Sequence, residues 1–151
     1  KLPAIGADGY FALEQQSAQL AEMTGLSKST ITHLLNRYGS LISEIFEIIE
    51  EDKKMAEQLS PELAYLKAEI LYAVTHEGAQ SVDDVLSRRT RISFEAKDKG
   101  LSVVDSIAHI IGEVLGWSAK ERKASIAHYR ELISRQNDIL IQAKEVTEKV
   151  S

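Results

Sequence analysis

The stretch YLKAEILYAVTHEGAQSVDDVLSRRTRISFE, residues 65–95, holds two helical patterns separated by a glycine. Ser60 and Pro61 precede it and supply an N-cap and a first-turn residue for a helix, which Gly78 then closes. Ser81 begins a second helix, with an acidic residue three positions later as in a capping box. The apolar side chains of the first helix recur every three or four residues: Leu63, Leu66, Ile70 and Val74. The stretch therefore predicts two consecutive helices and no strand.

Outward from this stretch the same helical period continues in both directions. Glycine and serine signals predict helices over residues 10–23, 28–38, 41–51 and 103–115. Ser118 begins a long last helix, whose turns beyond Ala143 are mostly polar and are expected to fray. The narrow apolar stripe of that helix consists of Ile126, Tyr129, Ile133 and Leu140. We expect an all-α bundle of six or seven helices over residues 10–151, with a long C-terminal helix.

Composition excludes several classes of protein. The 151 residues include no cysteine, so disulfides, thiolate metal sites and a cysteine nucleophile are excluded. The formal net charge is −5, which gives no global attraction to nucleic-acid phosphates. No segment approaches the roughly 20 apolar residues that a membrane span requires.

Catalytic and metal-binding signatures are scarce. The chain has no GxGxxG, no P-loop and no GxSxG. His76 and Glu77 resemble the start of a zinc-protease helix, but Gln80 stands where the second histidine is required. The remaining histidines lie singly on different predicted helices. We therefore expect no catalytic residue, no bound cofactor and no metal site in this chain.

A helix-turn-helix is the main alternative for the N-terminal part. Residues 19–35 have the required pattern, with Gly25 at the turn and small polar side chains at the start of the second helix. Lys28 is the only cation of the segment, however, and Glu22 opposes it; Arg37 lies just beyond. Phosphate anchoring normally takes several lysines or arginines. We favour an ordinary packed helical corner and keep DNA binding as the alternative.

The charges around the second quoted helix suggest an ion pair. At 100° per residue Arg89 falls on the apolar stripe of Val82, Val85 and Leu86, and Glu77 continues the stripe of the preceding helix. A charge on a buried face costs on the order of several kcal/mol unless it is paired. We predict a structural ion pair between Glu77 and Arg89. As an alternative, Arg88, Arg91 and His76 are candidates for binding an anion or another protein surface.

The same stretch resembles the C-terminal helical domain of FAD-dependent glycerol-3-phosphate dehydrogenases. The resemblance rests on His76-Glu77-Gly78-Ala79 followed by the residues 82–91, VDDVLSRRTR. The segment Gly112–Trp117 also fits the continuation of that domain. The resemblance to this family is good over residues 65–117 and weaker after Tyr129.

The resemblance implies a parent enzyme that oxidises glycerol 3-phosphate to dihydroxyacetone phosphate, reduces FAD and passes the electrons to a quinone or to oxygen. The family's flavin and substrate contacts lie in preceding domains, so no catalytic residue is transferred to this chain.

The resemblance also predicts the surroundings of this chain. Residues 1–9 are expected to be a linker from the missing FAD domain. That domain is the expected partner, together with a possible homodimer. Trp117, Tyr129 and the last helix are the expected partly exposed docking positions. The expected location is cytoplasmic, with the parent peripheral on the inner face of the cell membrane. A helical fragment with glycerol-3-phosphate dehydrogenase activity of its own is a further alternative.

Overall fold

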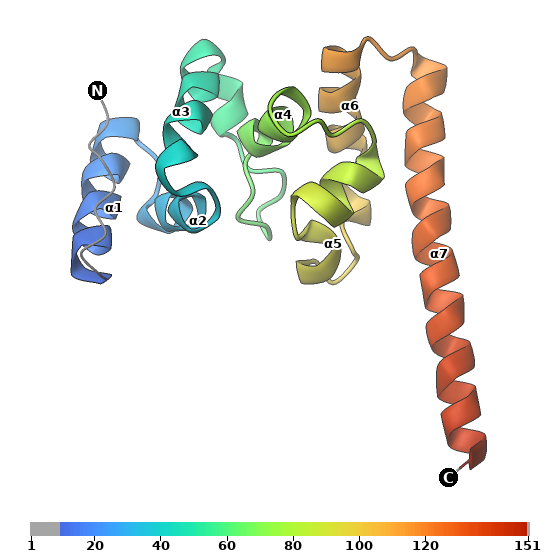
Figure 1. Cartoon of the computed structure of the whole chain (residues 1–151). Helices are drawn as coiled ribbons and strands as arrows, with labels where there is room; N and C mark the ends of the chain where they lie inside the picture. The colour runs from blue at the N-terminus through green and yellow to red at the C-terminus, as the bar shows by residue number, and fades with distance from the viewer. Residues whose placement is uncertain (1–9, 151) are drawn as a thin grey trace. The chain divides into compact units, whose positions relative to one another are not determined.

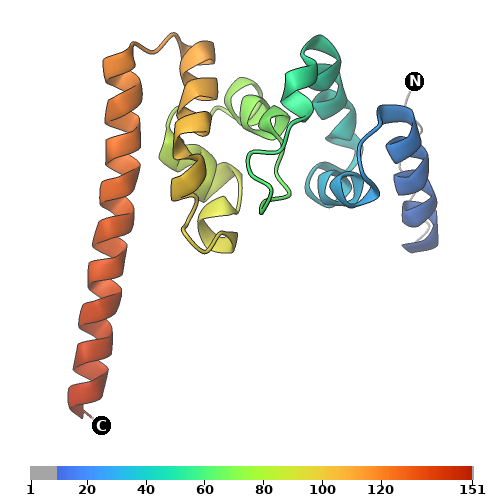
Figure 2. The same cartoon turned by 180° about the vertical axis from the view of Figure 1, so that it is seen from behind.

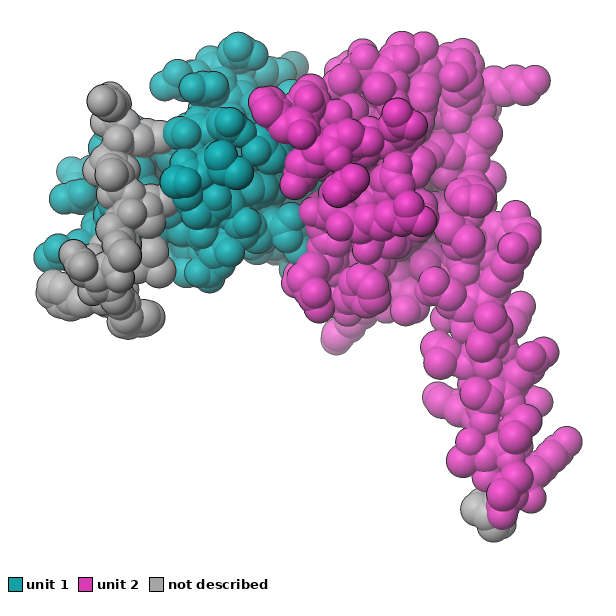
Figure 3. Space-filling model, viewed as in Figure 1, with its two compact units in different colours: residues 1–72 teal, residues 73–151 magenta. Residues whose placement is uncertain are grey.

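The computed structural model describes residues 10–150, with side chains from Gln15 onward. It divides into two compact units, residues 1–72 and 73–151, which Figure 3 distinguishes by colour. The described residues form seven α-helices and no strand, apart from a single isolated bridge between Gln58 and Leu66. The predicted all-α fold with a long C-terminal helix is confirmed. The predicted linker over residues 1–9 lies outside the described residues.

The first unit begins with three helices whose ends follow the predicted signals. Helix α1 is Tyr10–Thr24, α2 is Lys28–Tyr38 and α3 is Ile42–Glu51 (Figure 1). Gly25 has φ +76°, a left-handed conformation that ends α1. The Ser27 hydroxyl accepts a hydrogen bond from the Thr30 N–H at 3.1 Å and so caps α2.

Apolar side chains from these helices and from residues 66–72 form the core of the first unit. The buried set includes Leu20, Ile31, Leu34, Leu35, Ile42, Ile45, Phe46, Ile48, Leu66, Ala68 and Tyr72. Leu41, the first residue of the helix predicted over residues 41–51, is instead part of a 3-10 turn over Gly39–Leu41 that precedes α3, and its side chain is 49% exposed.

The fourth helix starts later than Ser60 and Pro61 predict. Helix α4 is Lys67–Thr75. The Ser60 hydroxyl accepts from the Glu62 N–H at 3.1 Å, which stabilises a local turn and not a helix start. The chain then folds back, since the Lys67 N–H donates to the Glu57 carbonyl. These backbone hydrogen bonds occupy the groups that an earlier helical turn would need.

The second unit contains the remaining helices. A helical segment from Val82 includes the π-helical turn Asp84–Arg89 and is followed by α5, Ile92–Glu95. Helix α6 is Val104–Leu115, as predicted. Helix α7 is Ala119–Val150 and shows no fraying before Val150. Ser118 caps α7, because its hydroxyl accepts from the Glu121 N–H at 3.1 Å.

Helix α7 packs along α6 only over its first half. Figures 1 and 2 show the rest of α7 continuing beyond α6 from both sides of the molecule. Tyr129 and Ile133 are its buried residues, and the Tyr129 hydroxyl donates to the Lys99 carbonyl at 2.6 Å. Among the helices described, none combines the length and apolarity that crossing a bilayer demands.

Candidate functional site

A fully buried carboxylate, Glu69, lies at the centre of the first unit. Its side chain is 0% exposed and accepts the Leu66 N–H at 2.7 Å. It also contacts three side chains of α2. His33 Nε2 lies 2.9 Å from Oε1, the Tyr38 hydroxyl donates at 3.1 Å, and Arg37 Nε lies 3.3 Å away. We call these four side chains the Glu69 hub.

Aromatic rings close the hub from outside. The Arg37 guanidinium lies over the rings of Tyr65 and Tyr38, 5.1 and 5.3 Å from their centroids. The His33 ring meets the Tyr65 ring edge-on at 4.8 Å. Burial and the Glu69 charge raise the pKa of Tyr38 well above its usual value, so its hydroxyl stays protonated and donates. Burial alone would lower the pKa of Arg37, but Tyr38, Tyr65 and Glu69 together raise it. The hub is a closed structural connection between α2 and α4.

Sequence reasoning missed the hub, because Glu69 was not among the candidate site residues. Its signal is nevertheless present. Residues 68–74, AEILYAV, are apolar almost all round the helix, as in a fully buried helix. A single acid there must find partners, and His33 and Arg37 lie four residues apart on one face of α2.

The hub also bears on the helix-turn-helix alternative. The α1–α2 corner forms as predicted, and Lys28 and Thr32 are exposed. Arg37, the second cation near the corner, is directed into Glu69. This leaves Lys28 at the corner to contact a phosphate backbone. One lysine is too little positive charge to anchor DNA. The structure gives the DNA-binding alternative no support.

The arginine segment of the second unit is exposed at most of its positions. Arg88 lies 3.6 Å from Asp84, and Arg91 lies 3.7 Å from Glu95, both as one-turn surface pairs. His76 is exposed, with Nδ1 2.7 Å from the Thr75 hydroxyl. None of these residues lines the pocket described below, and their exposure suits contact with another protein surface.

The geometry assumed for Glu77 and Arg89 is wrong. The Thr90 N–H donates to the carbonyl of Val85, five residues back, so the turn is π-helical and rotates less per residue than an α-helix. Thr90 therefore takes the buried position, 4% exposed, and Arg89 is exposed.

Glu77 is half-buried in the turn after α4, which ends at Thr75. Its Oε1 is buried without a hydrogen-bond partner among the described residues. The ion pair with Arg89 stays a prediction. Arg89→Leu and Glu77→Leu, singly and together, would test it, because additive effects mean no contact.

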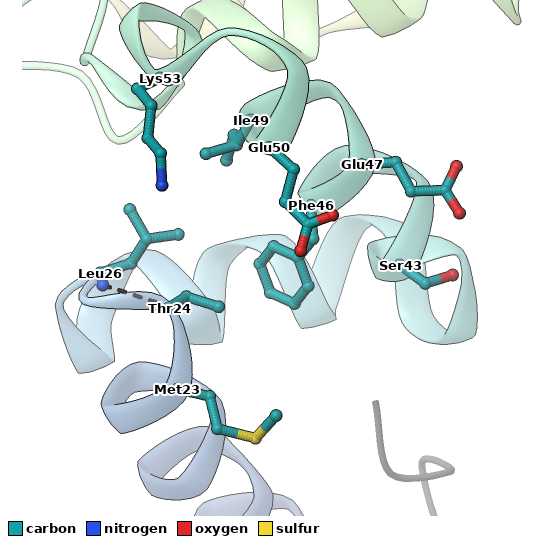
Figure 4. A pocket seen from close by; sticks show the side chains of 9 residues that line it. All are labelled: Met23, Thr24, Leu26, Ser43, Phe46, Glu47, Ile49, Glu50 and Lys53. Atoms are coloured by element: carbon teal, nitrogen blue, oxygen red, sulfur yellow. Dashed lines mark hydrogen bonds between the residues drawn. The ribbon is translucent and has the colours of Figure 1, made fainter. Parts of the chain in front are cut away.

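One pocket opens in the first unit beside the end of α1 and along α3 (Figure 4). Its volume is about 640 Å³. Leu26, Phe46 and Ile49 give it apolar walls, and Glu47, Glu50 and Lys53 add charged groups to its lining. Two carboxylates and one ammonium leave a net negative lining that repels a dinucleotide diphosphate, and no glycine is among the described lining residues. The pocket does not fit FAD. Elsewhere among residues 10–150, no group of three acidic or histidine side chains converges on a possible metal position.

The second half of α7 carries several exposed apolar side chains. Every residue from 134 to 150 is exposed, including Ile139, Leu140, Ile141, Val146 and Val150. The prediction that Tyr129 is partly exposed is wrong, since its ring is fully buried. Trp117 is half-buried against Gly112, as expected for a residue at the edge of a surface.

Comparison with known proteins assigns the chain to a family. Residues 1–122 match the model of the C-terminal domain of alpha-glycerophosphate oxidase. The chain belongs to this family. It is 36% identical to glycerol-3-phosphate dehydrogenase 2 of Mycobacterium tuberculosis over 144 residues, which is 95% of this chain and 24% of that protein. Glycerol-3-phosphate dehydrogenase of Mycobacterium leprae is equally similar over the same share of each chain.

More distant relatives share the same domain. A probable mitochondrial glycerol-3-phosphate dehydrogenase of Caenorhabditis elegans is 30% identical over 125 residues, 80% of this chain and 17% of that protein. The chain spans about a quarter of the length of its mycobacterial relatives. The predicted resemblance to glycerol-3-phosphate dehydrogenases is confirmed.

Proposed function

We propose that this chain is a non-catalytic docking module of a FAD-dependent glycerol-3-phosphate dehydrogenase. The parent oxidises glycerol 3-phosphate to dihydroxyacetone phosphate, and FAD carries the electrons to a quinone or to oxygen. The main support is that the match is to a C-terminal domain and covers only 24% of the relatives. The catalytic machinery then belongs to the remaining three quarters.

The chemistry of this chain supports the division of labour. Its buried titratable centre, the Glu69 hub, is closed by Tyr65 and Tyr38, and none of its four side chains lines the pocket beside α3. Its open pocket has an acidic rim, which disfavours a phosphate-bearing substrate. The module acts through surfaces that pack on the catalytic part of the same polypeptide, in a cytoplasmic enzyme that contacts the membrane peripherally.

The test compares this chain with a separately expressed catalytic part of the parent. Alone, the chain is expected to show no flavin absorbance and no dye reduction with glycerol 3-phosphate. Mixed with the catalytic part, it is expected to form a complex detectable by sedimentation. A flavin that copurifies with the chain alone would disprove the division of labour.

A charge reversal identifies the surface. Arg88→Glu is expected to weaken the complex, because Arg88 is exposed and only loosely paired with Asp84. Arg130→Glu is the matched control, since Arg130 is an exposed arginine on α7. If both variants bind the catalytic part as tightly as the wild type does, the arginine segment is not part of the docking surface.

A further inference from the structure

The buried seam of α7 continues as an exposed stripe on the second half of the helix. Tyr129 and Ile133 lie on the buried side of the first half, 0% and 5% exposed. At 100° per residue the same side continues after Ile133 with Gln136, Leu140, Ala143, Thr147 and Val150. Leu140 is 54% exposed and Val150 83% exposed. The helix thus carries a packing surface beyond the α6 residues that cover its first half.

The exposed stripe has one apolar edge and one polar edge. Leu132, Ile139 and Val146 follow each other at seven-residue intervals along one edge. Asn137 and Lys144 occupy the opposite edge. In the middle of the segment the stripe and its apolar edge contribute Ile139, Leu140 and Ala143, a seam wide enough to pack against another helix.

We propose that the second half of α7, residues 134–150, pairs with the same segment of a second copy of this chain as an antiparallel helix pair. A helix of this length is marginal in water without a tertiary partner. Its charges balance, with three cations and three anions over residues 134–150, so two copies do not repel each other. A bilayer surface is a poorer occupant, because the segment has no aromatic residue and no cationic excess.

The extent of the family match separates this segment from the proposed docking on the catalytic part. The family model ends at residue 122, whereas the match to the mycobacterial relative covers 95% of the chain and so continues past it. Residues 134–150 therefore lie outside the matched family domain, and the arginine segment tested above for docking does not include them. The inference does not rest on the proposed function.

The asymmetric edges determine the direction of pairing. In a parallel pair the apolar edge of one helix meets the polar edge of the other, which places Ile139 beside Lys144 of the second copy. In an antiparallel pair like edges meet, so Ile139 lies beside Val146 of the second copy, and Lys144 lies beside Asn137. Only the antiparallel arrangement covers the apolar edge and keeps the lysine at a polar boundary.

The polar residues of the seam determine the register. When Leu140 faces Ala143 of the second copy, Gln136 faces Thr147 at the same spacing along the helix. The amide and the hydroxyl, the two polar groups of the seam, then oppose each other and can form a hydrogen bond. This register also overlaps nearly the full length of the exposed segment, whose midpoint is residue 142.

The seam is short, and this limits the affinity. Residues 134–150 extend about 25 Å, so the pair buries less than the roughly 1,200–2,000 Å² of a standard interface. We expect a weak, concentration-dependent dimer of the 151-residue chain.

Sedimentation velocity of this chain over a wide concentration range tests the pairing. Leu140→Glu is expected to weaken dimerisation by about tenfold or more, because it places a charge in the seam. Ile141→Glu is the matched control. It adds the same charge at a residue that is 56% exposed but points away from the stripe. Circular dichroism checks that both variants remain helical. A chain that stays monomeric at the highest concentration, or equal weakening by both variants, would overturn the proposal.

Cysteine cross-linking tests direction and register, since the chain has no cysteine of its own. A mixture of Gln136→Cys and Thr147→Cys chains is expected to form a disulfide under mild oxidation. Either variant alone is not, because in this register the two identical positions lie about 16 Å apart along the axis, beyond the reach of a disulfide. A disulfide in each single variant would show a parallel pair and overturn the antiparallel assignment. Loss of the complex with the catalytic part in Leu140→Glu would overturn the choice of a second copy as occupant.

Discussion

The two compact units stabilise their interiors in different ways. The first unit places a carboxylate at its centre, and Glu69 receives hydrogen bonds or charge from four groups of the surrounding chain. The second unit buries an apolar core in which Tyr129 makes a neutral hydrogen bond to the Lys99 carbonyl. A charged centre specifies its neighbours strictly, because a missing partner leaves a charge in a low dielectric. A neutral centre tolerates the loss of one partner at much smaller cost.

The largest effect is expected at Glu69. Glu69→Ala should lower the free energy of unfolding by about 3 kcal/mol, since it leaves the Leu66 N–H and the Arg37 guanidinium of α2 without this acceptor. Glu69→Gln should cost less, because its amide oxygen still accepts the Leu66 N–H. Urea unfolding followed by circular dichroism measures both. The control is Glu47→Ala, an exposed acid on α3; a loss at Glu69 no greater than at Glu47 would refute the charged centre.

We expect the stability of the second unit to depend more on side-chain volume than on charge. A substitution at Gly100 tests this expectation. Gly100 has φ +85°, and an added Cβ would lie 2.8 Å from Leu86 Cδ2 and 3.0 Å from Ile92 Cγ2. Gly100→Ala should cost about 2–3 kcal/mol, from backbone strain plus overpacking. The matched control, Gly78→Ala, has a similar φ of +73° with nothing within 4 Å, and should cost only about 1 kcal/mol. Fluorescence of Trp117, the single tryptophan, reports on this unit.

The same contrast explains what the sequence can predict. Helix boundaries set by glycine and serine, such as those of α2 and α6, depend on interactions within a few residues, and they were predicted correctly. The start of α4 was not, because the backbone hydrogen bond from Lys67 to Glu57 overrides the local signal of Pro61. Arg89 was misplaced because a π-helical turn leaves the ordinary helical period, which periodicity cannot reveal. The Glu69 hub joins residues more than thirty positions apart, so sequence could indicate that Glu69 needs partners but not which ones.

The neutral centre of the second unit predicts a modest effect with a distinct pH dependence. Tyr129→Phe should cost about 1 kcal/mol through the lost bond to Lys99. Burial and the nearby Asp83 charge raise the pKa of Tyr129 from 10.0 to about 12. The stabilisation from its protonated hydroxyl is therefore complete below pH 10 and is lost as the pH rises toward 12. The difference in unfolding free energy between wild type and variant should narrow over that window. A difference independent of pH would contradict the assignment.

The smallest effect on stability is expected at Asp98, an exposed carboxylate that stabilises only the turn before α6. Its oxygens accept the N–H groups of Gly100 and Ser102, each at 2.9 Å, before α6 begins. Burial would raise the pKa of Asp98, but the hydrogen bonds from Ser102 and Gly100 outweigh it and lower the pKa below 3.8. The stabilisation is thus present above the unfolded pKa and is lost as the pH falls through the folded one.

Asp98→Ala should cost about 0.5 kcal/mol at neutral pH, the lower end of the range for a lost cap, and nothing in strong acid. Asp98→Asn keeps an acceptor, so it should retain part of the stability and lose the acid dependence. Trp117 fluorescence during urea unfolding at neutral and acidic pH measures both variants. An Asp98→Ala cost that equals the cost at Glu69 would remove the distinction between the two units, because an exposed carboxylate would then contribute as much as a buried one.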